Sequence, residues 1–328
     1  MPSQIFPNKK KNGKGMGTDH EYSLLALGNP YLQKYNTHPE VAIRWKGGFT
    51  NNKLVLTLIH LSNSPFGSDH SLEAIFDGFE DVPYRSSLSK ARERISWEYF
   101  ADQLKKTSKF LEQNRPTYGN LGIYAIDGHH ITLPCTKDLF QKGYNGRQLD
   151  NDIETPPFKA YVGHCCNALS QTTVGVTFNK SLNEHRDRPL LLASIPEKSL
   201  VIYDRLYLSS ELVKDHLSMN KVYFLARCRI NSSREIEAFF NSDKSRQTTQ
   251  TLGATLTLLR IVHPVTQEES VMATNLPESW LEINHIGNLY KMRWEIEIFQ
   301  KDFIMTAHGK IWHSRTENGI LQKFYAKF

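Results

Sequence analysis

The chain has 328 residues, a hydrophobic content of 39% and a mean hydropathy of -0.47, which fit a globular protein with one substantial core and one or two smaller modules. Its formal charge of +6 and pI near 9.0 favour a polyanionic partner without requiring one. No apolar run approaches the ~18 residues of a membrane helix, and no apolar segment follows the N-terminal lysines, so we expect neither a membrane span nor a secretory signal.

The cysteines indicate the redox environment. They form no C-x-x-C pair, and two of them are adjacent, which suits neither a zinc site nor a disulfide. His164, directly before that pair, is interpreted as a strand residue rather than a metal ligand. Reduced thiols are typical of cytoplasmic proteins. The four cysteines are Cys135, Cys165, Cys166 and Cys228.

The N-terminal third of the chain has no strand pattern. Residues 1–48 combine glycine, lysine, asparagine and proline with little periodicity, which predicts a loosely ordered basic arm. Residues 49–117 have helical periodicity and predict a helical domain. We expect helices from residue 51 to before Pro65, around 72–79, and at 97–111.

A basic segment within this helical region is a candidate DNA-binding element. Ser86 or Ser87 could cap a helix whose exposed face carries Lys90, Arg92 and Arg94. Helices with short connections and a basic, serine-capped member resemble a helix-turn-helix DNA reader. A plain helical bundle with a solvated basic face fits the same pattern equally well.

Residues 118–230 alternate between strand and helix patterns. Leu121–Asp127 and Ser199–Asp204 are short apolar runs that each end in an acid, as buried strands do. Residues 231–277 are interpreted as a β-rich insertion, and residues 278–328 as the second part of the core. Between the two acids we expect a hairpin and a helix, and after them a helix and a strand, at 158–178, 184–195, 209–219 and 222–230.

One continuous helix is predicted for about Leu281–Phe303, with two stripes along it. Its apolar stripe follows the spacing of a face that packs on a core. Tyr290, Arg293 and Glu297 form a second stripe that flanks the first, as side chains at the edge of a cleft do. An ordinary surface pair of Glu297 with Arg293 or Lys301 is the alternative. The apolar stripe is Leu289, Met292, Ile296, Phe299 and Phe303.

The three acids predict a shared site. If the strands ending at Asp127 and Asp204 are neighbours, they lie ~4.8 Å apart and their carboxylates reach the same mouth. Three crowded carboxylates raise one another's pKa unless divalent cations bridge them, and oxygen ligands select Mg²⁺ or Mn²⁺. Two such ions act on phosphodiesters. Taken singly, Asp127 could belong to an Asp-Gly turn and Asp204 could pair with Arg205.

These segments carry a family resemblance. Ala125–Pro134, Val201–Ser209 and Tyr290–Glu297 resemble the three acid motifs of DDE transposases, and more closely those of the insertion-sequence subgroup with the YREK signature. The segment Arg85–Arg94 also looks like the N-terminal segment of that subgroup. The similarity covers roughly residues 50–328, and the third motif is the most specific because Tyr290, Arg293 and Glu297 match at fixed helical spacing.

The resemblance implies an α/β fold, namely a ribonuclease H-like mixed sheet flanked by helices, with an N-terminal helical domain and a β-rich insertion. It implies a Mg²⁺-dependent enzyme, in which Mn²⁺ can substitute, that cuts transposon ends and joins them to target DNA. Asp127, Asp204 and Glu297 would hold the metals, and Tyr290 and Arg293 would contact the DNA end. The expected partners are terminal inverted repeats, target DNA and a second copy of the chain. The expected location is the bacterial cytoplasm at the nucleoid.

The chain departs from the family pattern at three points, and two of them, Ile304 and the early end, motivate an alternative function. The signature lysine is replaced by Ile304, with Lys301 and then Lys310 as substitutes; His129 stands where a small hydroxyl residue is common; and the chain ends at Phe328, early for the family. The alternative is a truncated relative that binds terminal repeats without cutting them. A third class, a metal-free hydrolase that uses two carboxylates as a glycosidase does, gives Arg293 no role.

Overall fold

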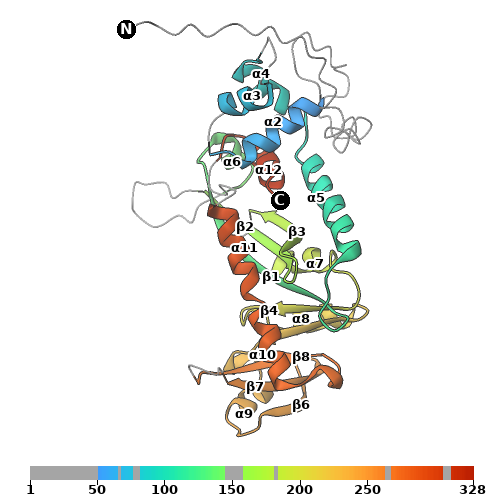
Figure 1. The fold of residues 1–328 in the computed structure, drawn as a ribbon. Coiled ribbons are helices and arrows are strands. Elements are labelled where there is room, and N and C mark those ends of the chain that lie inside the picture. The colour runs from blue at the N-terminus through green and yellow to red at the C-terminus, as the bar shows by residue number, and fades with distance from the viewer. Residues whose placement is uncertain are drawn as a thin grey trace, which may run out of the picture.

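The computed structural model describes residues 51–65, 68–76, 82–144, 158–180, 184–262, 267–305 and 312–328. An eight-stranded sheet runs through these residues in the order β3-β2-β1-β4-β5-β8-β7-β6. Helices α2–α4 and α12 lie at one end of this sheet, and α9 with β6–β8 lies at the other (Figure 1). The predicted basic arm, residues 1–48, falls outside the described residues. No helix in the described part of the chain is long and apolar enough to cross a membrane.

The first five strands form one half of the sheet. β1 and β2 pair antiparallel, as do β2 and β3, whereas β4 and β5 continue on the other side of β1 in parallel. This order, 3-2-1-4-5, is that of a ribonuclease H-like sheet, so the predicted fold class is confirmed. The strands are β1 (Gly122–Leu133), β2 (Phe158–Asn167), β3 (Thr172–Asn179), β4 (Ser199–Tyr203) and β5 (Val222–Arg227).

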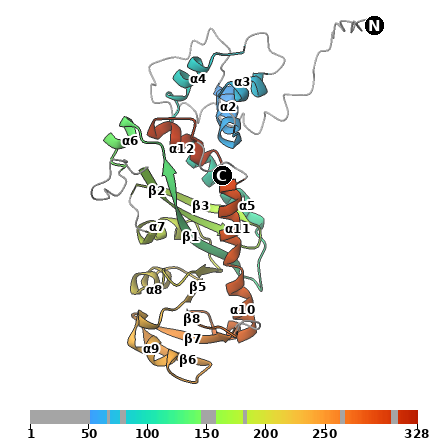
Figure 2. The same ribbon diagram turned by 90° about the vertical axis from the view of Figure 1, so that its left-hand side faces the viewer.

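Helices cover both faces of this sheet, as two buried faces require. The side chains of Tyr124 and Tyr203 pack toward α7 (Glu184–Leu192) and α8 (Ser210–Leu217). The alternate residues of the same strands, such as Ile123 and Ile202, pack toward α10 (Ile283–Lys291). α11 (Trp294–Met305) continues along the latter face, and Figure 2 shows both helices running beside β1 and β5. The apolar runs of the sequence are therefore strands buried on two sides.

The insertion extends the same sheet. β8 (Glu269–Thr274) pairs antiparallel with β5 and with β7 (Ala254–Val262), and β6 (Arg246–Thr251) pairs with β7. α9 (Arg234–Phe240) covers one face. All three strands lie within residues 231–277, the segment interpreted as a β-rich insertion, although the sequence of β6 is polar and has no strand pattern. β6 is an edge strand whose polar side chains alternate between exposed and half-buried positions.

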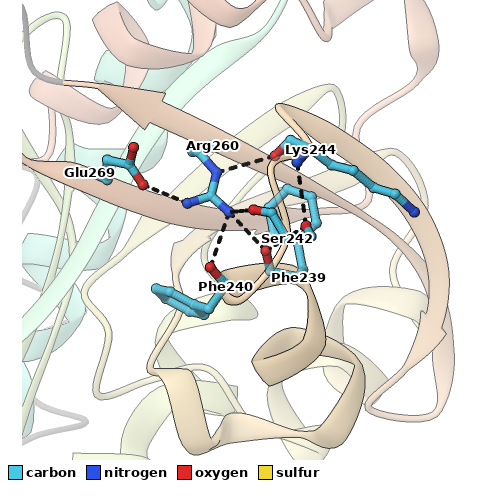
Figure 3. A network of polar contacts seen from close by, with 6 residues as sticks. All are labelled: Phe239, Phe240, Ser242, Lys244, Arg260 and Glu269. Carbon is cyan, nitrogen blue, oxygen red and sulfur yellow. Dashed lines mark hydrogen bonds and ion pairs between the residues drawn. The ribbon is translucent and has the colours of Figure 1, made fainter.

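Arg260 of β7 holds the insertion together (Figure 3). Its side chain is mostly buried, and its guanidinium donates to carbonyl oxygens at the C-terminal end of α9, which α-helical hydrogen bonds leave unsatisfied. It also pairs with Glu269 on β8 at 2.5 Å. The accepting carbonyl groups belong to Phe239, Phe240, Ser242 and Lys244.

We expect Arg260→Met to loosen the insertion. Loss of these buried charge-assisted hydrogen bonds should lower the free energy of opening of the β6–β7 unit by about 2–4 kcal/mol. Hydrogen exchange of the β6 and β7 amides measures this. Arg246→Met is the matched control, because Arg246 pairs with an exposed carboxylate, Glu278, and should cost less than about 1 kcal/mol. Equal effects of the two substitutions would contradict the role given to Arg260.

The N-terminal helices form a separate core with the C-terminal helix. Apolar side chains of the four N-terminal helices pack together, and Tyr325 at the end of α12 (Glu317–Tyr325) packs against them, with its ring stacked on that of Trp97 at 5.2 Å. The helices are α2 (Asn51–Asn63), α3 (Ser68–Phe76), α4 (Arg85–Arg92) and α5 (Glu98–Leu111).

Two expectations about the basic segment are wrong. α4 begins at Arg85, with Tyr84 at its N-cap position, so neither Ser86 nor Ser87 caps it. Arg92 is buried, with 9% of its surface exposed, and does not share an exposed face with Lys90. Its guanidinium instead donates to Gly319 O at 2.9 Å and to Gln322 Oε1 at 3.2 Å, both on α12. Arg92 is buried because it binds α12, which is distant in the sequence. The local sequence pattern around Arg92 therefore cannot predict its burial.

The helix predicted for Leu281–Phe303 is two helices, α10 and α11, with a turn at Met292 and Arg293. The amides of Met292, Arg293, Glu295 and Ile296 each donate to the carbonyl group three residues back. Hydrogen bonds of this kind form a 3₁₀ turn, which has fewer residues per turn than an α-helix. Such a turn inside a long helical segment often marks a functional position. The apolar stripe persists across the turn, since Leu289 and Ile296 are both buried.

Candidate active site

Strand register brings Asp127 and Asp204 side by side. Ala125 pairs with Ile202 in the parallel β1–β4 ladder, so two residues further along each strand Asp127 stands level with Asp204. Both aspartates occupy the face that α10 and α11 cover, because side chains alternate along a strand. Neighbouring strands lie ~4.8 Å apart, so the two carboxyl groups lie close together where the parallel pairing of β1 and β4 ends. We call this place the mouth of the sheet.

The predicted position of Asp127 at the end of its strand is wrong, and so is the Asp-Gly turn alternative. β1 continues to Leu133, because its pairing with β2 extends from Tyr124 to that residue. Asp204, by contrast, directly follows β4. Asp127 therefore lies where the parallel pairing with β4 stops and the antiparallel pairing with β2 goes on. Its backbone is held on the β2 side, and its side chain lies on the face of the sheet that α10 and α11 cover.

α11 supplies the third acid. Ile296 is fully buried against Ala125 of β1 and Cys166 of β2, which fixes this part of the helix over the strand that carries Asp127. Phe299 continues the contact and lies 4.7 Å, between ring centroids, from the buried His164. Glu297 follows Ile296 and is half-buried at the edge of the contact. The charges of Asp204 and Glu297 both act on Asp127, so the three acids lie within electrostatic range of one another.

Burial dominates the electrostatics of the mouth. It is the main cause that raises the pKa of Asp127 to about 6, and the negative charges of Asp204 and Glu297 contribute to the rise. The Gly128 amide, which donates to Asp127 Oδ1 at 2.9 Å, and the Arg293 guanidinium act in the opposite direction. A carboxyl group in this state favours either a proton or a cation as its partner.

Arg293 and Tyr290 complete the arrangement. Arg293 Nη1 donates to Glu297 Oε1 at 2.6 Å, and the guanidinium carbon lies 5.8 Å from the centre of the Tyr290 ring. Burial raises the pKa of the Tyr290 hydroxyl, on which the charges of Arg293 and Asp204 also act. The i,i+4 pair of Arg293 and Glu297 therefore exists, but it lies beside two other acids rather than on an ordinary surface.

The donor set suits a hard divalent cation. Carboxylate oxygens are the ligands that Mg²⁺ and Mn²⁺ take, and the raised pKa of Asp127 reflects repulsion and burial that a cation would offset. Among the described residues, however, no three His, Cys, Asp or Glu side chains are already arranged to hold an ion. The hydrogen bond to Arg293 occupies Glu297, so Asp127 and Asp204 are the ligands that register alone places together.

The raised pKa of Asp127 gives a prediction for Asp127→Asn. Between pH 4 and 6 the folded chain holds a proton that the unfolded chain releases, so this contribution to stability is lost as pH rises through 6. We expect Asp127→Asn to increase the free energy of unfolding by about 2 kcal/mol at pH 8 and to change it little at pH 4. Denaturant unfolding with a chelator present measures this. A pH-independent difference would contradict the cause assigned to the shift.

The remaining predicted contact residues lie apart from the acids. Lys301 is exposed on α11, one turn beyond Glu297, and Lys90 is exposed on α4 in the N-terminal core. Arg94 is half-buried just after α4, and Arg92 is buried in the contact with α12. The side chain of Ile304 and all of Lys310 fall outside the described residues. His129, two residues after Asp127, is half-buried on the same face of β1.

Sequence reasoning missed three residues beside the site. Trp294 follows Arg293 directly, yet 64% of its surface is exposed, and Ile298 one turn later is 47% exposed. An aromatic residue in the polar part of the helical pattern was the available signal. Gln171, at the β2–β3 turn, donates to Glu295 Oε2 at 2.7 Å and ties the start of α11 to the sheet. No sequence pattern links these two positions.

Comparisons with known proteins place this geometry. The family model described as the transposase DDE domain matches residues 119–328, the segment that carries all three acids. A search of curated proteins gave no match. The piggyBac transposase in its synaptic complex with hairpin DNA is similar over 88% of this chain and 67% of its own, with 13% identity and a TM-score of 0.45. Ciona intestinalis endonuclease V in complex with inosine-containing DNA is similar over 62% and 98%, with 9% identity and a TM-score of 0.26.

Proposed function

Because this chain belongs to the transposase DDE domain family, we propose that it cuts transposon ends and joins them to target DNA with the help of divalent cations. We place it in the YREK-signature subgroup of bacterial insertion sequences, on the spacing of Tyr290, Arg293 and Glu297. The observation that carries the proposal is the strand register that sets Asp127 level with Asp204, with Glu297 near enough for its charge to act on Asp127.

The acids are proposed to hold Mg²⁺, for which Mn²⁺ can substitute. Asp127 and Asp204 would provide ligands from the rigid sheet, and Glu297 would provide the third from α11. Such ions, when bound, supply an activated water or hydroxyl and stabilise the leaving oxygen of a phosphodiester. The sheet contributes by fixing two carboxylates in register, because a fixed ligand pair needs no reorganisation when the substrate arrives.

Arg293 is proposed to exchange partners during binding. Its guanidinium can take a terminal phosphate in place of the Glu297 carboxylate, since both groups present a pair of anionic oxygens to the fork of an arginine. Glu297 would then be released toward Asp127. Tyr290 and Lys301 lie on the same two helices and are proposed to contact the same DNA end. The basic residues Lys90 and Arg94 are proposed to contact the repeat further from the cut.

The assembly and its surroundings complete the proposal. Residues 49–117 are proposed to be the unit that recognises terminal inverted repeats. Two copies of the chain would hold the paired DNA ends. An element has two ends to be cut and joined, and each chain provides one set of catalytic acids. Such an enzyme would work in the bacterial cytoplasm at the nucleoid.

Cleavage of DNA that contains the flanking inverted repeats tests the proposal. With Mg²⁺ or Mn²⁺ the purified chain should release the 3′ ends, and a chelator should stop the reaction. Retarded migration of repeat DNA without any nick would support the alternative of a binding protein, which the engaged state of Glu297 favours. Hydrolysis of another substrate in the presence of chelator would support the metal-free carboxylate mechanism.

A further inference from the structure

A second group of cations lies where α12 packs on α2 and α4. It comprises Arg92 of α4, His313 before α12, Lys323 of α12 and Lys327 just after that helix, and we call it the basic junction. Lys323 Nζ lies 3.0 Å from His313 Nδ1, and Arg92 Nη1 lies 3.4 Å from the carbonyl oxygen of His313. The side chain of His313 also contacts the backbone of Leu61 on α2. Four groups that can carry positive charge therefore meet at one contact between helices.

Two of these cations are buried against neutral partners. Arg92 is 9% exposed and donates to an amide oxygen of Gln322 and to backbone carbonyl groups, whereas Lys323 is 2% exposed and contacts an imidazole. Neither forms a salt bridge with any residue in the described ranges. The acid that acts on Arg92 is its neighbour Glu93, which is exposed. Buried lysine and arginine are normally paired with acids, so this composition calls for an explanation.

Each of these cations also makes its neighbours harder to protonate. Burial, together with the charges of Lys327 and Arg92, lowers the pKa of Lys323 to about 7. Burial and the charge of Lys323 lower the pKa of His313 to about 4, with Arg92 and Lys327 adding to the effect. Lys323 and Lys327 are spaced i,i+4, where like charges repel. An anion at this point would offset both burial and repulsion.

We propose that the basic junction is a phosphate-binding site that fastens α12 to the N-terminal helices. His313 and Lys327 are half-buried and form the side of the junction that meets solvent. Lysine ammonium groups donate charge-assisted hydrogen bonds to phosphate oxygens. The phosphate can come from a nucleic acid backbone or from solution. The basic junction includes none of the three acids. Phosphate binding at the junction can therefore be tested independently of the proposed cleavage chemistry.

Thermal unfolding in inorganic phosphate tests the site. At constant ionic strength and pH 7.5, increasing phosphate should raise the Tm of the full chain along a saturating curve, because a ligand that binds only the folded state stabilises it. Lys323→Met should raise the Tm without phosphate, because it replaces a buried polar amine with an apolar side chain of similar length. It should also weaken the apparent phosphate affinity roughly tenfold or more, the effect of one charge-assisted hydrogen bond. Lys327→Gln should reduce the response in the same direction.

Lys109→Met is the matched control, because Lys109 is exposed on α5. Its phosphate response should equal that of the unmodified chain. A Tm that does not depend on phosphate would overturn the proposal, and so would equal responses of the Lys323 and Lys109 variants. In either case the role of the lysines would be limited to stabilising the C-terminal end of α12, whose partial negative charge favours cations.

Duplex DNA distinguishes the two sources of phosphate. If the DNA backbone occupies the junction, Lys323→Met should weaken DNA binding on every sequence and reduce the slope of log affinity against log salt by about 1. If DNA binding is unchanged while the phosphate response is lost, the junction binds the free anion. Both results support the site, and the catalytic acids can be left intact throughout.

Discussion

We expect Asp204→Asn to reduce the rate of DNA cleavage by at least about 10³-fold, since a metal ligand that stabilises transition-state charge is worth several kcal/mol. Asparagine keeps the shape of the side chain but removes the charge. Binding of the same DNA should fall little, because the proposed DNA contacts lie on other residues. A gel assay that separates bound, nicked and joined DNA measures both quantities on one sample.

Asp243→Asn is the matched control for this experiment. Asp243 is exposed in the insertion, and the same loss of charge there should leave cleavage within about twofold, as expected for a surface residue. Cleavage that survives in the Asp204 variant would remove the carboxylate site from the mechanism. Loss of cleavage in both variants would point to overall charge rather than to the site.

We expect Gly128→Ala to destabilise the fold by about 3 kcal/mol or more, because it forces a side chain into a filled space. A Cβ atom at Gly128 would lie 1.8 Å from the hydroxyl oxygen of Tyr161, on the face of β1 opposite Asp127. Tyr161 is fully buried, and its hydroxyl lies 3.2 Å from that of Tyr207. The ring has no exposed direction in which to move, so β1 must shift and carry Asp127 with it. Denaturant unfolding measures the loss of stability.

Gly287→Ala provides the contrast. Gly287 lies inside α10, and a Cβ atom there would meet only Ile261 at an ordinary 3.6 Å. Alanine should therefore stabilise this helix by about 0.5–1 kcal/mol. If Gly128→Ala proves as mild as Gly287→Ala, the close contact with Tyr161 does not constrain the strand.

The part of the site that follows from local pattern could be predicted. The apolar runs before Asp127 and Asp204 fix strands, and the stripe through Leu289 and Ile296 fixes a helix face, so the acids and their mutual approach follow from periodicity and family motifs. The turn at Arg293 could not be predicted this way, because its hydrogen bonds change from four to three residues back without any Pro or Gly to mark it.

The errors share a physical cause, which is pairing between distant segments. β1 runs past Asp127 because β2 supplies partners as far as Leu133. Arg92 is buried because Gln322 and Gly319 accept its hydrogen bonds from α12. β6 is a strand because β7 offers an edge, although its own residues are polar. In each case the decisive neighbour lies outside any window that periodicity can inspect.

The direct pairing of β8 with β5 has a mechanical consequence. β5 is the immediate neighbour of the strand that leads to Asp204, so an unbroken ladder of main-chain hydrogen bonds connects the insertion to the catalytic mouth. A flap on a flexible tether could swing over its substrate, whereas a segment joined in this way is as stiff as the sheet itself. If the insertion binds a DNA duplex, the distance between that duplex and the three acids is therefore fixed. Differences between DNA substrates would then have to be met by bending of the DNA.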